Sequence, residues 1–209
     1  MSILLHNKDC MAAMAQMKDN EFQLACVDPP YGIGNKFKGG KTGKMQFNSI
    51  VEKGWDNAPD DIYFSELIRV SENQIIWGGN YFNLPPSRCF IIWDKLISED
   101  FSLAMCEMAW VSFDKTAKIY KYNNPKNNKI HPTQKPVALY KWLLKHYSKP
   151  GDKILDTHLG SGSIAIACWD YELDLVGYEI DKDYFKAAKK RIDAYMKQPR
   201  GLLNEREIN

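Results

Sequence analysis

Short apolar runs recur along the chain and alternate with stretches in which apolar residues return every three or four positions. Apolar runs of about 4–8 residues, bounded by turn residues, are typical of buried strands. The sequence predicts seven strands: Ile3–His6, Phe22–Val27, Gln74–Trp77, Cys89–Trp93, Glu107–Phe113, Lys153–Thr157 and Asp174–Tyr178. Glu107–Phe113 alternates only loosely, and we expect it to pair with Cys89–Trp93 as an antiparallel hairpin at the edge of the sheet.

Helical spacing of apolar residues fills the intervals between most of these strands. It predicts helices over Met11–Met17, Asp60–Ser71, from near Pro136 to before Pro150, Ser163–Asp170 and Asp183–Lys197. The first strand–helix–strand unit should be parallel and right-handed. This alternation favours an α/β fold with a mostly parallel sheet, and 209 residues are enough for one such domain.

Asp28-Pro29-Pro30-Tyr31 directly follows the strand Phe22–Val27. Each proline fixes its φ and lacks an N–H, so the strand ends there, with Asp28 at its carboxyl end. Open α/β sheets bind their ligands at that edge. The Asp28 carboxylate and the Pro29 carbonyl are two rigidly held acceptors, and Tyr31 adds a flat aromatic face. Such a group suits the amino edge of adenine or cytosine, although a plain turn uses the same residue types.

A second informative stretch runs from Ile154 to Ser163, where a strand enters a Gly160-Ser161-Gly162 loop that opens a helix. Glycines let the backbone approach a ligand closely, and a helix N-terminus offers free N–H groups to an anion. That anion is either a phosphate or the carboxylate of a methionine moiety. Glu179 ends the next strand, 19 residues after Gly160, where an acid can bind both hydroxyls of a ribose.

The glycine loop by itself is ambiguous. Gly160-x-Gly162-x-x-Ala165 with Glu179 also fits the dinucleotide-binding fingerprint of a nicotinamide-dependent oxidoreductase. Two features favour S-adenosylmethionine. The first glycine comes four residues after Asp156, a longer approach than a dinucleotide turn prefers. Nothing else in the chain resembles a hydride-transfer site, whereas Asp28–Tyr31 suits methyl transfer.

The distribution of charges and cysteines bears on the binding partner, on disulfide or metal sites and on the location of the protein. The net charge is only +2, but lysines cluster in two segments without acids, 36–44 and 115–135, which points to phosphate contacts within residues 32–57 and 114–130. Five cysteines without a CxxC pair argue against a disulfide framework and against a zinc or other metal site. No signal-peptide pattern and no bilayer-length apolar run are visible, so we expect a cytoplasmic protein.

Taken together, the two stretches resemble the β-group DNA amino-methyltransferases, which methylate adenine N6 or cytosine N4. The order is the same: catalytic motif, variable segment, His131–Pro136, then glycine loop. The resemblance covers Ile3–Asp114 and Ile130–Ile192 and is greatest to phage- and prophage-borne members. It implies a circularly permuted, Rossmann-like, S-adenosylmethionine-dependent methyltransferase fold: one domain over 1–209, with a mostly parallel seven-stranded sheet and one antiparallel edge hairpin.

The resemblance also implies roles for individual residues. The target base would be held by Asp28, Pro29, Pro30 and Tyr31. The cofactor would contact Asp9, Cys10, Asp28, Thr133, Gln134, Lys135, Asp156, His158, Gly160, Ser161, Gly162, Ser163 and Glu179. Of these, Asp9 and Cys10 would lie by the cofactor adenine and Thr133 to Lys135 by its amino-acid end. The DNA backbone would be gripped by Lys36, Lys38, Lys41, Lys44, Lys118, Lys121, Lys126 and Lys129.

Two departures from the family pattern affect these expectations. His158-Leu159 stands where many relatives carry an aromatic residue before the first glycine, so the methionine pocket can differ. The target-recognition segment is short, which leaves the recognition sequence open.

The function predicted from the sequence is therefore a site-specific DNA adenine-N6 methyltransferase acting on a flipped-out base in double-stranded DNA. Aspartate, rather than serine, at the first position of the motif favours adenine over cytosine as the target base. A cytosine-N4 methyltransferase, a nicotinamide-dependent oxidoreductase and a cofactor-binding DNA protein with little turnover remain alternatives, as does RNA as the substrate. A homodimer and a cognate restriction nuclease are further partners that the resemblance allows.

Overall fold

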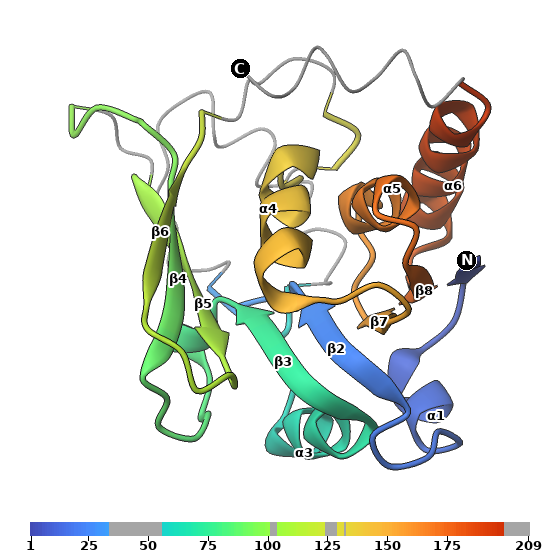
Figure 1. Cartoon of the computed structure of the whole chain (residues 1–209), viewed down its shortest axis with the longest axis horizontal. Coiled ribbons are helices and arrows are strands. Elements are labelled where there is room, and N and C mark those ends of the chain that lie inside the picture. Colours follow the sequence, from blue (N-terminus) through green and yellow to red (C-terminus); the bar gives the residue numbers. More distant parts are fainter. Residues whose placement is uncertain (34–55, 101–103, 124–128, 132, 199–209) are drawn as a thin grey trace.

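A computed structural model describes residues 1–33, 56–100, 104–123, 129–131 and 133–198 (Figure 1). Strands and helices alternate along most of this chain. In order they are β1 Ile3–His6, α1 Cys10–Met14, β2 Phe22–Val27, α3 Asp61–Val70, β3 Ser71–Trp77, the 3-10 helix η2 Gly79–Tyr81, β4 Cys89–Asp94, β5 Cys106–Val111, β6 Lys118–Lys121, α4 Val137–Tyr147, β7 Lys153–Asp156, α5 Ser163–Asp170, β8 Asp174–Tyr178 and α6 Lys182–Met196.

The strands form one sheet in the order β1-β8-β7-β2-β3-β5-β4-β6. Among the described residues β5 alone runs against its neighbours: it pairs antiparallel with both β3 and β4, whereas every other pairing is parallel. The predicted α/β class, the mostly parallel sheet and the hairpin of Cys89–Trp93 with Glu107–Phe113 are therefore confirmed.

The sheet has eight strands rather than the predicted seven, because β6 lies within the segment that the sequence showed only as a polar lysine-rich loop. Lys118 and Lys121 face solvent and hide the strand pattern. Tyr120 holds β6 in place: it pairs with Trp93 of β4, and its ring lies 5.2 Å from that of Trp142 on α4. The hairpin consequently does not close the sheet, since β6 forms the edge beyond β4.

Two further differences lie at element ends. Ser71 begins β3 instead of ending the helix before it, because its side chain donates to the Leu67 carbonyl and the backbone turns extended there. Helix α1 ends at Met14, so Met17 lies beyond it.

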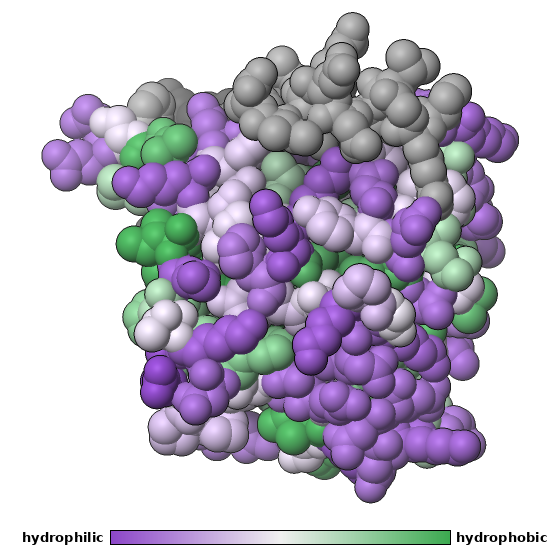
Figure 2. All heavy atoms as spheres, in the orientation of Figure 1, coloured by the Kyte–Doolittle hydropathy of each residue, from purple (hydrophilic) through white to green (hydrophobic). Residues whose placement is uncertain are grey.

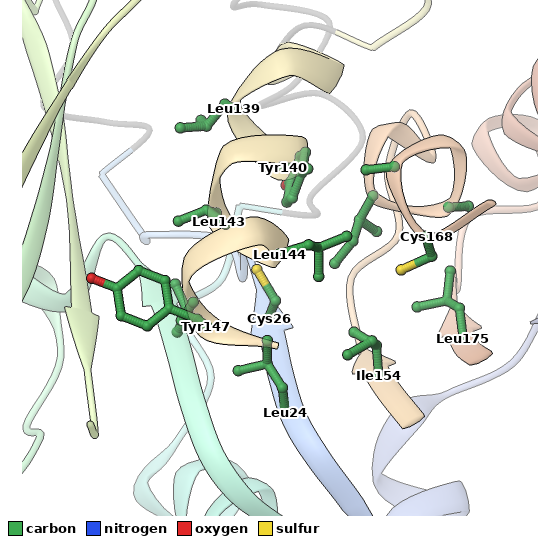
Figure 3. Close-up of a cluster of buried hydrophobic side chains, with 14 of the residues drawn as sticks. Leu24, Cys26, Leu139, Tyr140, Leu143, Leu144, Tyr147, Ile154, Cys168 and Leu175 are labelled. Carbon is green, nitrogen blue, oxygen red and sulfur yellow. The ribbon is translucent and has the colours of Figure 1, made fainter. Parts of the chain in front are cut away.

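Helices cover both faces of the sheet, which gives three layers (Figure 1). Alternate residues of β2 belong to different cores: Leu24 and Cys26 pack with α4 and α5, whereas Ala25 and Val27 pack with α1 and α3. Figure 3 shows the larger core, with Leu144 of α4 beside Cys26 of β2. On the face seen in Figure 2, apolar residues form separate patches between hydrophilic ones.

Candidate active site

Three acids lie at the carboxyl ends of three adjacent strands. Asp28 follows β2, Asp156 ends β7 and Glu179 follows β8. Since β8, β7 and β2 are neighbours and parallel, these ends share one edge of the sheet. The sheet order thus brings Asp28 to the strand that leads into the glycine loop.

Asp28 and Tyr31 form the first half of the site. The Tyr31 hydroxyl donates to Asp28 Oδ1 at 2.8 Å, which folds the Pro29-Pro30 turn back on itself. The Tyr31 ring is stacked on Tyr81 of η2, with centroids 5.1 Å apart and planes 20° apart. The motif therefore presents a carboxylate beside an ordered pair of aromatic rings.

The second oxygen of Asp28 is also bound within the protein. Lys135 Nζ lies 2.5 Å from Asp28 Oδ2 and 3.1 Å from Glu107 Oε2 of β5, and Glu107 in turn pairs with Lys95 at 2.6 Å. The side chain of Lys135 is only 2% exposed. Its amine lies between these two carboxylates, as a buried ammonium requires paired acids, and its predicted place at the amino-acid end of the cofactor stays a prediction.

Burial and the buried lysine act in opposite senses on these carboxyl groups. Burial raises the pKa of Asp28 above its usual range, and the Lys135 amine opposes that rise. Burial also acts to raise the pKa of Glu107, but Lys135 and Lys95 outweigh it and hold this pKa at about 2. Burial acts to lower the pKa of Lys135, yet Asp28 and Glu107 keep it above its usual value. The amine is therefore charged.

The glycine loop forms the second half of the site. Gly160 and Gly162 both have positive φ, at 50° and 72°. A Cβ at Gly162 would lie 2.5 Å from Ile192 Cδ1, so a larger residue would displace this side chain of α6, and the positive φ favours glycine. The Glu179 carboxylate accepts from the Gly160 N–H and the Asp181 N–H, both at 2.9 Å, and thereby ties β8 to the loop.

A pocket of about 250 Å³ opens beside Glu179. Four of the predicted cofactor residues line it: Asp9, Cys10, His158 and Glu179. Tyr63 and Thr157 close another part, with their hydroxyls 2.6 Å apart. A nucleoside fits this donor set, because a buried carboxylate suits ribose hydroxyls and the remaining wall offers both apolar and polar contacts to a base.

Burial shifts the pKa values of several ionisable groups in and beside the pocket. Burial raises the pKa of the Asp156 carboxyl to about 8, with Asp28 and Glu179 adding to the rise. Burial lowers the pKa of His158 to about 4, so this imidazole is neutral near pH 7. Burial raises the pKa of the Cys10 thiol to about 12. His158 and Cys10 therefore present uncharged groups in a wall that also carries the carboxyl groups of Asp9, Asp60 and Glu179.

The segment before α4 is held against the glycine loop. Ser163 Oγ donates to the Lys135 carbonyl at 2.8 Å, and Ser161 and Ser163 hydroxyls lie 3.2 Å apart. Thr133 and Gln134 fold back on His131, through the Thr133 hydroxyl at 3.0 Å and the Gln134 N–H at 3.1 Å. The backbone of Lys135 thus lies beside Ser163, and the predicted contact of Thr133 to Lys135 with a cofactor stays a prediction.

Some predicted DNA contacts can be placed and others cannot. Lys118 and Lys121 are exposed on β6, and Lys129 lies just before His131. Lys36, Lys38, Lys41, Lys44 and Lys126 lie outside the described residues.

Three residues of the site were missed from the sequence. Glu107 lies in a strand-like run, and its charge amid Cys106-Glu-Met-Ala-Trp was the available signal. Tyr63 has helical spacing with the core residues of α3, which hides its polar contact with Thr157. Tyr81 gives no local signal, since its role depends on Tyr31 from another strand end.

Comparison with known proteins agrees with this geometry. Residues 55–190 match the N6/N4 methyltransferase family, described as DNA methylase. The match spans more than half of the chain, and the chain therefore belongs to this family of DNA methyltransferases, which use S-adenosylmethionine. The part of the site that lies within the match includes Glu107, Lys135, the glycine loop and Glu179, whereas Asp28 precedes it.

Individual proteins are also similar to this chain. The Type II methyltransferase M.HpaI of Haemophilus parainfluenzae is 24% identical over 237 residues, covering 89% of this chain and 73% of that protein. The M1.HpyAVI–SAM complex superposes with a TM-score of 0.59 at 19% identity, covering 91% and 99% of the two chains. PvuII DNA methyltransferase, described as cytosine-N4-specific, gives 0.63 at 11% identity, covering 99% and 90%. At such identities the structural likeness establishes the fold alone.

No helix in the described part of the chain is long and apolar enough to cross a bilayer.

Proposed function

We propose that this chain is a DNA adenine-N6 methyltransferase that moves a methyl group from S-adenosylmethionine to a flipped-out adenine. The observation that carries the proposal is the Asp28 carboxylate, fixed by Tyr31 and Lys135 at the end of β2, one strand away from the glycine loop. The site therefore has an acceptor for an amino group next to a nucleoside-sized pocket.

The exocyclic nitrogen of adenine is a poor nucleophile, because its lone pair is delocalised into the ring. Hydrogen bonds from the amino group to Asp28 and to the Pro29 carbonyl favour tetrahedral geometry at nitrogen and free the lone pair. The freed lone pair would then accept the methyl group that bound S-adenosylmethionine supplies, with the methyl–sulfur electron pair left on sulfur, and the nitrogen would give up one proton to water. Orientation of the two reactants and fixed acceptors supply the acceleration.

Tyr31 supplies the stacking surface for the target base. A duplex hides the adenine amino group, so the base must leave the stack and find a new aromatic partner. The Tyr31 ring lies beside Asp28, since its own hydroxyl binds that carboxylate.

The cofactor, when bound, supplies an electrophilic methyl group on its sulfonium. Glu179 would accept from the ribose hydroxyls, with Asp9, Cys10 and His158 around the nucleoside. Asp156, Ser161, Ser163 and the two loop glycines would surround the methionine part, with Thr133 and Gln134 beside its amino-acid end. The Asp9 side chain also caps α1 by accepting from the Met11 N–H, which leaves one carboxylate oxygen for a ligand.

Cytosine-N4 methylation is the second candidate. The family includes both activities by its name, and one structural neighbour is described as cytosine-N4-specific. We favour adenine because aspartate, rather than serine, heads the motif.

For DNA binding we propose phosphate contacts by Lys118, Lys121 and Lys129 together with the lysines of residues 36–44 and Lys126. A cytoplasmic location, a homodimer and a cognate nuclease remain predictions.

Replacement of Asp28 tests this proposal. Asp28→Asn and Asp28→Ala should abolish methyl transfer to duplex DNA while the affinity for S-adenosylmethionine stays within about threefold, since Asp28 contacts the base. Asp174→Asn is the matched control, because Asp174 begins β8 at the other end of the strands. Methyl transfer by Asp28→Ala within about tenfold of the unaltered protein would exclude the assigned role.

A further inference from the structure

Lys135 is a buried cation at the centre of the site. Its amine touches one oxygen each of Asp28 and Glu107 and lies 3.4 Å from the Tyr31 hydroxyl. It also lies 5.1 Å above the Trp77 ring. An ammonium so far from water is costly unless it is fully paired, so this arrangement needs a reason beyond stability.

Asp28 itself supplies that reason. The target amino group needs an acceptor at Asp28, whereas a protonated carboxyl group carries a donor on one of its oxygens, and burial favours that neutral form. The groups that face Asp28 are Lys135, Glu107 and Tyr31, with Cys26, Asp156 and Tyr140 further away. Lys135 is the cation among them; the acids would each push Asp28 towards protonation.

We propose that Lys135 is a positioning residue for methyl transfer: its amine, anchored on Glu107, keeps the Asp28 carboxylate ionised and fixed in rotation so that it accepts from the target amino group. This inference rests on the proposed function of Asp28 and adds the residue that keeps Asp28 in the state required for that function.

The anchoring by Glu107 explains why the amine stays in place. Glu107 comes from β5, the antiparallel strand, and is itself held by Lys95 at 2.6 Å. Lys135 precedes α4, and its carbonyl is bound by Ser163 of the glycine loop. The amine is thus held by Glu107 of β5 and by Asp28 after β2, while the backbone of Lys135 is held by Ser163 at the start of α5.

Two replacements with different expected effects test the proposal. The acid limb is the pH range in which the single-turnover methylation rate falls as the pH is lowered. In Lys135→Met this limb should move to higher pH by roughly one to three pH units, the shift expected from one neighbouring charge. In Glu107→Gln the same acid limb should stay or move to lower pH, because a negative neighbour of Asp28 is gone. Lys135→Arg should restore the acid limb of the unaltered protein. Lys141→Met, which removes the ion pair of α4 with Asp170, is the matched control.

A second measurement does not depend on turnover. The carboxyl carbon of Asp28, followed by carbon NMR through a pH titration of the ligand-free protein, should titrate at higher pH in Lys135→Met and not in Lys141→Met. This readout separates the two proposals: an unexpected base or no product would count against the proposed function, while the titration still tests Lys135.

The inference is overturned if Lys135→Met lowers the rate equally at every pH with an unmoved acid limb, or if the Asp28 titration is unchanged. If Lys135→Met does not fold, Glu107→Gln decides the question. An acid limb that moves to higher pH in Glu107→Gln contradicts the proposal.

Discussion

Gly78 leaves the space that the Tyr31 ring occupies. A Cβ at position 78 would lie 2.2 Å from Tyr31 Cε1, and Gly78 has φ +71°, so the ring packs directly on the backbone between β3 and η2. Tyr81 of η2 stacks on the same ring. The loop after β3 therefore sets the position of an aromatic side chain from the turn that follows β2.

Gly78→Ala should accordingly displace Tyr31 and lower kcat/KM for DNA methylation by at least about tenfold, or ~1.4 kcal/mol. Gly151→Ala is the control: it also has positive φ, at +89°, but a Cβ there meets nothing within 4 Å. Both variants bear the backbone strain, so the difference between them measures the clash with Tyr31. Equal kinetics for the two would show that the ring is not fixed by Gly78.

Glu179→Gln should weaken S-adenosylmethionine binding by roughly 10–100-fold, the loss typical of a hydrogen bond to a charged group. The amide retains one acceptor for the Gly160 or Asp181 N–H but can no longer accept from two sides. Isothermal titration calorimetry gives the dissociation constant directly. Glu21→Gln is the control, since Glu21 pairs with Lys153 before β2, at the other end of the sheet. An unchanged affinity would remove Glu179 from the cofactor site.

Asp156 gives a prediction for stability against pH. Its pKa is about 8 in the folded chain and near 3.8 for an ordinary Asp, so between these values the folded state binds a proton that the unfolded chain has lost. Stability from this group is present below about pH 4 and is lost as pH rises through about pH 8. Asp156→Asn should therefore flatten the fall in Tm of the ligand-free protein with rising pH and raise Tm near pH 8. Parallel Tm curves for the two proteins would contradict the assignment.

Lys118 and Lys121 offer a test of the DNA-binding surface. If each contacts a phosphate, Lys118→Glu and Lys121→Glu should each reduce the slope of log affinity against log salt by about one, uniformly across DNA sequences. Lys145→Glu, in the last turn of α4, should leave the slope unchanged. Fluorescence anisotropy at several salt concentrations measures the slope, and unaltered slopes for both β6 variants would place the DNA elsewhere.

The strands with strong apolar character were predictable from the sequence, and so were the acids at their ends. Phe22–Val27 and Asp174–Tyr178 are buried on both sides of the sheet and read as continuous apolar runs. The prolines after Asp28 and the glycines after Asp156 mark these ends locally. Asp28, Asp156 and Glu179 could be grouped because parallel neighbouring strands bring their carboxyl ends together.

What could not be predicted depends on contacts between distant segments. Lys135 belongs to a lysine-rich stretch, and only the sheet order brings Glu107 and Asp28 to its amine. Strand β6 is stabilised by pairing with β4 and by Trp142, while its own residues are half lysine. In both cases the tertiary partners, and not the local pattern, determine the structure.

The central claim is methyl transfer to the amino group of adenine in DNA. The most direct measurement is incubation of the purified protein with mixed-sequence duplex DNA and methyl-labelled S-adenosylmethionine, followed by digestion to nucleosides and mass spectrometry. We predict label in N6-methyladenine. Label in N4-methylcytosine would keep the mechanism at Asp28 and contradict the choice of base, and the absence of label from DNA despite cofactor binding would contradict the proposed function.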